Sequence, residues 1–270
     1  MAKRLQHLLL LAYRVAMRSG VLNLPGMRWV FEACYGLYKQ FVEARYVALL
    51  RPWVVPGTIV VDVGANAGFF TRYFAEWTGP EGRVLAIEPE QRNVERLSAM
   101  IRAHRLDRVV DVVHAAAAEQ AGQVALTVDP FHPAGHYLSP DGVPTRAVTI
   151  DDLVRQHPQG RVSLIKIDVQ GAELRVLQGA AWTLQSSRPA LLVELDDKAL
   201  RSQGASVAAV VEFLASFGYR GQLMSSRGLS PVFARQDLVT ESLAHEYIDA
   251  LFTGDVAVRP PEAVSVSPAS

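Results

Sequence analysis

The stretch Thr58–Phe74, which reads TIVVDVGANAGFFTRYF, decides the fold class of this chain. It opens with the β-branched run Ile59–Val63, broken by Asp62, and such a run is typical of a buried strand. A glycine turn follows, and an aromatic, amphipathic helix begins after Gly68. A strand, a glycine turn and a helix start in this order hold nucleotide-like ligands in parallel α/β proteins. We therefore expect a ligand site at the carboxyl end of this strand.

The order of residues within the turn narrows the ligand class. A dinucleotide site typically carries GxGxxG, whereas this turn reads DxGxNxG, with Asp62 two residues before Gly64. A carboxylate there repels a pyrophosphate and suits a cationic ligand, such as the amino group of S-adenosylmethionine. Gly64 and Gly68 are expected to let the backbone approach the ligand closely, because they have no Cβ. A glycine turn of some other α/β protein is the alternative.

Length and composition bound the class of protein. The chain has 270 residues, 50% of them hydrophobic, which is enough for one large α/β domain with appendages. Lys+Arg and Asp+Glu both number 27, and this balance disfavours a general nucleic-acid binder. The single cysteine, Cys34, excludes an intramolecular disulfide and is expected to be a small core residue. We expect a cytoplasmic protein.

The two ends of the chain differ from its middle. Residues 1–50 predict a helical extension, whose second helix, Trp29–Leu50, carries an aromatic stripe. The apolar run Leu8–Ala12 is too short to span a bilayer. The helix that contains this run is expected to pack on the domain or on a partner subunit. Binding to a membrane surface remains an alternative, and the chain could form a homodimer. Residues 256–270 predict a disordered tail.

Between these ends, strand-like and helix-like segments alternate, which is typical of a parallel sheet with helices on both faces. The predicted strands after the first are Val84–Ile87, Val109–Val113, Val162–Asp168, Ala190–Glu194 and Gly221–Met224. The predicted helices are Gly68–Trp77, Arg92–His104, Ala172–Ala180 and Ser206–Phe217. We assign 51–236 to one domain, with a hairpin inserted at about 123–150, and 237–255 to a C-terminal helix.

Two acidic residues are predicted to face the ligand crevice. Glu88 closes the second strand, where a carboxylate can accept hydrogen bonds from both ribose hydroxyls of a ligand. Asp168 closes the fourth strand, and Lys166 shares its face because side chains alternate along a strand. Glu173 opens the next helix. It could have a functional role, or it could serve only to stabilise the helix by interacting with the helix dipole.

Taken together, these motifs resemble those of FkbM-type methyltransferases over approximately residues 45–235. The matching runs are VDVGANAGFFT, IEPE, VTIDDL, LIKIDVQGAELRVLQGA and LLVE. The resemblance implies the class I, Rossmann-like α/β fold: a mostly parallel sheet of seven strands in the order 3-2-1-4-5-7-6, the last antiparallel. Pro231–Ala234 would supply that last strand. Members commonly have Glu where this chain has Gln170.

The resemblance also implies an activity, S-adenosylmethionine-dependent O-methylation of a saccharide, polyketide or other natural product. The cofactor-binding residues that it implies are Asp62, Gly64, Ala65, Asn66, Gly68, Glu88 and Asp168. His114, Ala115 and Ala116 are expected to border the adenine.

A hydroxyl acceptor benefits from a general base. Asp168 or Glu173 is the expected base, and Lys166 is expected to orient a carboxylate or the substrate. His132 and His136, in the inserted segment, are the alternative bases.

Other functions remain open at this stage. A catalytically silent cofactor-binding or interaction protein is disfavoured because Asp62, Glu88 and Asp168 occur together. An NAD-dependent oxidoreductase is disfavoured because the GxGxxG motif is missing. A nucleic-acid methyltransferase is disfavoured by the neutral charge and by the sequence after the fourth strand, which reads DVQG and not an Asn/Asp-Pro-Pro-aromatic motif. No set of His, Cys and carboxylate residues shows metal-ligand spacing, although Asp168, Glu173 and Glu194 could together bind a divalent cation.

Overall fold

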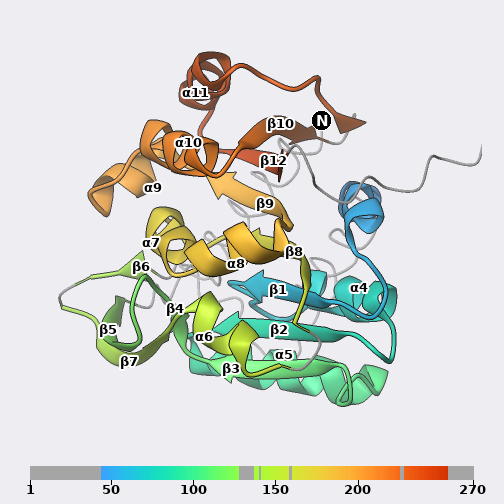
Figure 1. The fold of residues 1–270 in the computed structure, drawn as a ribbon. Helices are drawn as coiled ribbons and strands as arrows, with labels where there is room; N and C mark the ends of the chain where they lie inside the picture. Colours follow the sequence, from blue (N-terminus) through green and yellow to red (C-terminus); the bar gives the residue numbers. More distant parts are fainter. Residues whose placement is uncertain (1–43, 128–136, 140, 158–159, 226–227, 255–270) are drawn as a thin grey trace, which may run out of the picture.

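The computed structural model describes residues 44–127, 137–139, 141–157, 160–225 and 228–254 (Figure 1). Of the predicted N-terminal extension it describes α3 (Ala44–Val47) and η3 (Ala48–Trp53). Cys34, the predicted membrane-surface or dimer contact of the first helices, and the predicted tail all lie outside the described residues. Among the described helices, none is long and apolar enough to cross a membrane.

The large sheet has the strand order β11-β10-β12-β9-β8-β1-β2-β3. Its strands are β1 (Ile59–Val63), β2 (Arg83–Glu88), β3 (Val110–His114), β8 (Val162–Ile167), β9 (Ala190–Leu195), β10 (Tyr219–Ser225), β11 (Gly228–Leu229) and β12 (Ile248–Gly254). β12 runs antiparallel to both β9 and β10, and the two-residue β11 extends the predicted seven strands to eight. The class I fold and the order 3-2-1-4-5-7-6 are confirmed.

The antiparallel strand comes from a different segment than predicted. Residues 231–234 form no strand, and the predicted helix over 237–255 is wrong in its second half, because α11 (Arg235–Leu243) is followed by β12. A central strand must donate and accept on both edges, and Pro231 has no N–H to donate. β12 instead buries Ile248, Ala250, Leu251 and Phe252 between two neighbouring strands.

Helices cover both faces of this sheet (Figure 1). One core cluster packs Ile59, Val61 and Val63 against α6 (Ile150–Arg155), α7 (Glu173–Gln178), α8 (Ala181–Ser187), α9 (Asp197–Ser202), α10 (Val207–Ser216) and α11. The other packs Val60 against η3, α4 (Phe69–Thr78) and α5 (Gln91–His104). Because side chains alternate along β1, this strand serves both cores and is buried throughout.

An inserted hairpin leaves the carboxyl end of β3. β4 (Ala116–Ala117) follows β3 after one residue and pairs with β7 (Val143–Val148), which pairs antiparallel with β5 (Gly122–Thr127). β6 (Tyr137–Leu138) lies on the other edge of β5. In Figure 1 the hairpin projects on the side to which the arrowheads of β1 and β2 point. The alternative bases His132 and His136 lie outside the described residues.

Candidate active site

The loop after β1, residues 64–68, is held by hydrogen bonds to the neighbouring strand. The backbone N–H groups of Gly64 and Ala65 donate to the carbonyl oxygen of Ile87 at 3.0 and 3.1 Å. The N–H of Gly68 donates to the carbonyl oxygen of Ala65 at 2.9 Å. These bonds fix the loop against the end of β2.

Glu88 continues this attachment from the end of β2. Its carboxylate accepts from the N–H of Asn66 at 2.8 Å, from the N–H of Glu90 at 3.0 Å and from the Asn93 side-chain amide at 3.3 Å. The N–H of Ala67 donates to the Asn66 side chain at 2.7 Å. All five N–H groups of residues 64–68 therefore donate within the protein, whereas a pyrophosphate site presents such groups to its ligand.

Backbone conformation favours glycine at both positions of the turn, and at Gly64 a backbone contact requires it as well. Gly64 has φ 72° and Gly68 has φ 89°, in the left-handed region that favours glycine. A Cβ on Gly64 would lie 2.0 Å from the backbone oxygen of Asp168, and one on Gly68 would lie 2.3 Å from Cε of Met100. These glycines therefore lie against the end of β8 and against α5, and their close approach to a ligand stays a prediction.

Asp62 is buried inside the protein. Its side chain is 0% exposed; Oδ2 accepts from the Thr71 hydroxyl at 2.6 Å, and Oδ1 lies 3.5 Å from Nζ of Lys166. A carboxylate in this place joins β1 to α4 and β8. The direct ligand contact expected from the sequence stays a prediction, at a side chain that the protein itself encloses.

Lys166 lies beneath the glycine loop. Its ammonium donates to the carbonyl oxygens of Gly64 and Val63 at 2.8 and 3.2 Å, and lies 3.6 Å from Oδ2 of Asp168. Burial by itself lowers the pKa of Lys166, but the carboxylates of Asp168 and Asp62 outweigh it and raise the pKa. Lys166 is therefore a fixed cation that orients two carboxylates and the loop, as expected in part from the sequence.

Asp168 reaches solvent, unlike the other two predicted catalytic residues. Its side chain is 38% exposed, whereas that of Lys166 is 5% exposed. The N–H of Asp168 donates to the carbonyl oxygen of Val63 at 3.3 Å, which sets the residue beside the first glycine of the loop. Its carboxylate is thus the predicted catalytic group that an acceptor can reach.

Glu173 is buried under the loop that follows β8. Its Oε1 accepts from the N–H groups of Gly171 and Val169 at 3.0 and 3.3 Å, and its Oε2 has no hydrogen-bond partner among the described residues. Burial, aided by the charge of Asp168 and opposed by the N–H groups, raises the pKa of Glu173 to about 7. Glu173 thus binds the turn ahead of its own helix, which supports the loop that carries Asp168.

Three polar residues extend the site towards β12, in an arrangement that was not predicted from the sequence. Gln170 donates from Nε2 to Oε1 of Glu194 at 3.1 Å and to Oδ1 of Asp168 at 3.4 Å. Glu194 lies opposite Asp249 in the β9–β12 register. Burial, followed by the charges of Asp168, Asp249 and Glu173, raises the pKa of Glu194 well above its usual value. Alternation of side chains along β9 places Glu194, but Asp249 is found only once β12 is known.

The remaining predicted contacts lie beside Glu88. His114 is its neighbour in the β2–β3 register, and Ala115 and Ala116 are buried immediately after it. Proximity to an adenine stays a prediction. Within the described residues no group of three or more His, Cys, Asp or Glu side chains is arranged to hold a metal ion.

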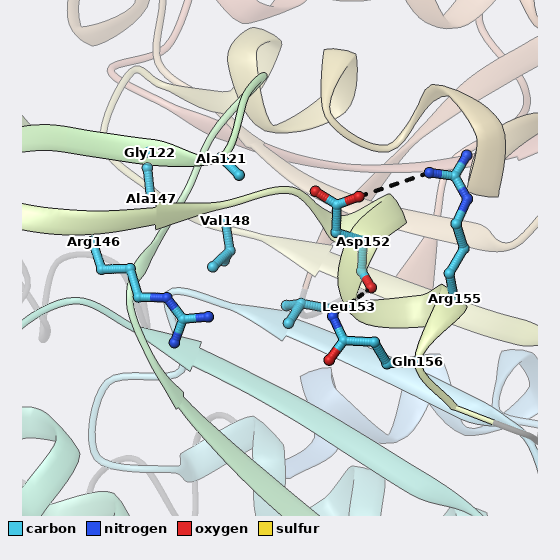
Figure 2. A pocket seen from close by; sticks show the side chains of 9 residues that line it. All are labelled: Ala121, Gly122, Arg146, Ala147, Val148, Asp152, Leu153, Arg155 and Gln156. Atoms are coloured by element: carbon cyan, nitrogen blue, oxygen red, sulfur yellow. Dashed lines mark hydrogen bonds and ion pairs between the residues drawn. The ribbon is translucent and has the colours of Figure 1, made fainter.

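A separate pocket of about 440 Å³ lies between β7 and α6 (Figure 2). Arg146, Leu153 and Gln156 line it, and Figure 2 shows the guanidinium of Arg155 turned to Asp152, at 3.8 Å. None of the residues predicted for the site lines this pocket. The carboxyl edge of the sheet therefore remains the candidate active site.

Comparison with known families decides the class. The family model of the methyltransferase FkbM domain matches residues 62–220, more than half of the chain. The chain belongs to the FkbM methyltransferase family. The match includes Asp62, Glu88, Asp168, Glu173 and Glu194, so it covers the glycine loop and the carboxyl ends of β2, β8 and β9. This FkbM-family chain is therefore a methyltransferase.

Two relatives of this FkbM-family protein carry names that state an acceptor. The 31-O-demethyl-FK506 methyltransferase FkbM of Streptomyces tacrolimicus is 30% identical over 177 residues, covering 53% of this chain and 67% of the relative. The hexuronic acid methyltransferase AglP of Haloferax volcanii is 28% identical over 146 residues, covering 53% of this chain and 59% of the relative.

A solved structure shares the fold. The methyltransferase FkbM of Methylobacillus flagellatus KT superposes with a TM-score of 0.51 at 21% identity, and the match covers 89% of this chain. It covers 54% of that structure, so this chain spans about half of its length.

Proposed function

We propose that this methyltransferase takes its methyl group from S-adenosylmethionine and transfers it to a hydroxyl of a saccharide, polyketide or other natural product. One observation carries the choice of cofactor: the carboxyl edge is anionic, and the N–H groups of residues 64–68 already have partners. The carboxyl groups along that edge are Glu88, Asp168, Glu173, Glu194 and Asp249, although burial raises the pKa of Glu173 and of Glu194 and so reduces their share of the charge. Such an edge suits a cationic sulfonium and disfavours the pyrophosphate of NAD, because like charges repel.

The proposed cofactor-binding surface is the glycine loop with the ends of β2 and β3. Gly64, Ala65, Asn66 and Gly68 supply its backbone, and Glu88 supplies its carboxylate. Because the Glu88 oxygens also accept from the loop, a ribose contact at Glu88 is coupled to the order of the loop. Ala116 is proposed for the adenine side. We assign Asp62 a positioning role, since it is buried against Lys166 and Thr71.

S-adenosylmethionine, when bound, supplies an electrophilic methyl carbon whose C–S bond breaks as the acceptor O–C bond forms, with the electron pair left on sulfur. Asp168 takes the proton of the acceptor hydroxyl, because its carboxylate is the exposed one beside the loop. Lys166 holds that carboxylate from below, and Glu173 holds the turn that follows it. Positioning of this kind supplies much of the acceleration in a transfer between two bound groups.

The acceptor class rests on the relatives. Their names specify a demethylated FK506 and a hexuronic acid, which support a natural-product or sugar hydroxyl as the acceptor. A catalytically silent member of the family would not need an exposed carboxylate, that of Asp168, which Lys166 links to the glycine loop. This arrangement favours an active enzyme.

The test begins with the affinity of the purified chain for S-adenosylmethionine and, separately, for NAD, measured by isothermal titration. We expect binding of the first and none of the second. Formation of S-adenosylhomocysteine is then followed with a panel of hydroxyl acceptors. Asp168, which the resemblance also implied as a cofactor contact, is assigned to the acceptor side of the site. Asp168→Asn is therefore expected to keep cofactor affinity and lower turnover by about 10²–10⁴-fold, the range for a general base.

Asp107→Asn is the matched control, since Asp107 is an exposed aspartate in the loop before β3. Binding of NAD in place of S-adenosylmethionine would refute the proposed cofactor. Full turnover by Asp168→Asn would refute its role as the base while leaving the cofactor assignment intact.

A further inference from the structure

Gln170 occupies an unusual place in the turn between β8 and α7. Its φ is 55°, in the left-handed region that glutamine rarely adopts, and Gly171 follows with φ 103°. Glu173 holds this turn by accepting from the N–H groups on either side of Gln170, those of Val169 and Gly171. The turn thus fixes the direction in which the Gln170 side chain leaves the backbone.

The Gln170 amide lies between two carboxyl groups from neighbouring strands. Nε2 is 3.1 Å from Oε1 of Glu194 and 3.4 Å from Oδ1 of Asp168. An amide nitrogen carries two N–H donors, so a single side chain serves both oxygens. Lys166, by contrast, meets Asp168 on its other oxygen, Oδ2. The two oxygens of Asp168 are therefore held by different partners, one by a buried cation and the other by an amide.

We propose that Gln170 is a positioning residue that joins Asp168 to Glu194, so that the two carboxyl groups serve the acceptor as one unit. The inference rests on the proposed function, in which Asp168 receives the hydroxyl proton. It adds Gln170 and Glu194 to the residues on which transfer depends, although neither is the proton acceptor itself.

The charges around the pair give this unit its chemistry. Asp168 faces Lys166 from β8 and Glu173 from α7. Glu194 faces Asp249 from β12. Tyr46 of α3 lies beside Asp249, and burial and the charge of Asp249 raise the pKa of its phenol. Burial, then Asp168, Asp249 and Glu173, raises the pKa of Glu194, and Lys166 opposes them. Negative charge on Asp168 therefore helps Glu194 to keep its proton.

The contact also couples the charges of the two carboxyl groups. When the acceptor hydroxyl gives its proton to Asp168, one of the causes that raise the pKa of Glu194, the negative charge of Asp168, is removed, whereas burial remains. The N–H groups of Gln170 stabilise negative charge on either carboxyl group.

The titration of Glu194 tests the link without any acceptor. Protein with ¹³C-carboxyl-labelled glutamate is titrated by NMR, and Glu194→Gln assigns the signal. Gln170→Leu removes the donors, and Gln170→Gly removes them while suiting the left-handed backbone. Both are expected to raise the Glu194 midpoint by about 0.5–1 unit, the worth of one hydrogen bond. Asp168→Asn is expected to lower it.

Gln178→Leu, at an exposed position at the end of α7, is the matched control and is expected to leave the midpoint unchanged. Unchanged midpoints in both Gln170 variants, or an equal shift in Gln178→Leu, would overturn the inference. A second readout is kinetic: Gln170→Leu should lower kcat and leave the affinity for S-adenosylmethionine unaltered. A loss of that affinity with kcat retained would also overturn it.

The two proposals fail in different ways. The expected Glu194 shifts in a protein that binds no S-adenosylmethionine would refute the proposed function and leave the link between the carboxyl groups standing. Methyl transfer from S-adenosylmethionine with no shift in either Gln170 variant would refute the link alone.

Discussion

Around the glycine loop, on the β1–β2 side of the site, each N–H of residues 64–68 has a partner within the protein, and Glu88 accepts three hydrogen bonds. Across β8, on the β9–β12 side, Asp168, Glu194 and Asp249 gather with one amide between the first two. We call these the loop half and the acid half. The loop half is ordered by its own bonds, whereas the acid half gathers carboxyl groups, so that burial and the charges of Asp168 and Asp249 raise the pKa of Glu194.

This difference has a physical meaning for catalysis. A surface that binds a constant cofactor gains from being formed in advance, because no ordering cost remains at binding. A surface that receives a proton gains from charge that is left unneutralised. Lys166 lies at the boundary and serves both halves, since it contacts one carbonyl of the loop, one carbonyl at the end of β1 and two carboxylates.

The largest effect is expected at this boundary. Lys166→Met leaves the fully buried Asp62 carboxylate without its cation, and breaking a buried pair by removing one partner costs about 3–5 kcal/mol of the free energy of unfolding. Urea titration measures that free energy. Lys198→Met, at an exposed lysine of α9, is the control.

Adding Asp62→Asn to Lys166→Met should recover part of the loss, because the orphaned charge is then gone. A Lys166→Met loss below about 1 kcal/mol would show that Lys166 does not tie the two halves together.

The next effect separates packing from backbone strain in the loop half. Gly64→Ala places a Cβ against the backbone oxygen of Asp168, whereas Gly57→Ala, at a similar φ of 78°, meets nothing within 4 Å. The Gly57 variant should lose about 1 kcal/mol of stability from φ alone, and the Gly64 variant about 2–4 kcal/mol, since strain and overpacking add. Thermal or urea unfolding compares the two, and equal losses would contradict the close contact between the loop and β8.

A pH-dependent effect is expected at Glu173, which supports the turn next to the acid half. The pKa of Glu173 is about 7 in the folded protein against 4.5 for the unperturbed group, so the unfolded chain gives up this proton at lower pH. Stability from this group is therefore lost as pH rises from 5 to 8, by about 2–3 kcal/mol. Glu173→Gln removes the dependence, and its stability relative to the unmodified chain should rise by that amount.

Urea titrations at pH 5 and pH 8 measure this gain. Glu81→Gln, at an exposed residue of the turn before β2, should show the same pH dependence as the unmodified chain. A Glu173→Gln variant that follows the unmodified chain at both pH values would mean that Glu173 is not held as a buried acid.

The smallest effect concerns the support of the acid half by the hairpin. Arg175 of α7 donates from Nε and an Nη atom to the Glu119 carboxylate at 2.7 and 2.8 Å, with both side chains about one-third exposed. A double-mutant cycle of Arg175→Met and Glu119→Gln should give a coupling of about 0.5–1 kcal/mol that shrinks in salt. A coupling that is zero at low salt would show that this contact adds nothing.

The sequence predicts the loop half far better than the acid half, and the reason is chain distance. Glu88 and the glycine loop belong to one strand–turn–helix–strand unit, so spacing along the chain places them. Asp168 is also placed correctly, because a residue that ends a parallel strand faces the same edge. Asp249 was not predicted, since its position depends on β12 pairing with β9 across about fifty residues of chain.

The roles of residues are harder to predict than their places. Asp62 was expected to meet the ligand, but its partner Lys166 lies on another strand, and only the β1–β8 register brings them together. Gly64 was correctly singled out, yet the neighbour that demands a glycine there is the backbone of Asp168. Spacing reveals that a residue type is required, whereas its contacts reveal why.

The place of β12 between β9 and β10 sets the order in which the molecule can be completed during synthesis. β10 is synthesised before β12 and can pair with β11, but it cannot join β9 and the rest of the sheet, because β12 lies between β10 and β9. Until residues 248–254 emerge, β9 keeps an open edge, and open edges invite pairing with other chains. A nascent chain therefore finishes its glycine loop, with Lys166 beneath it, well before Glu194 gains its neighbour across the sheet.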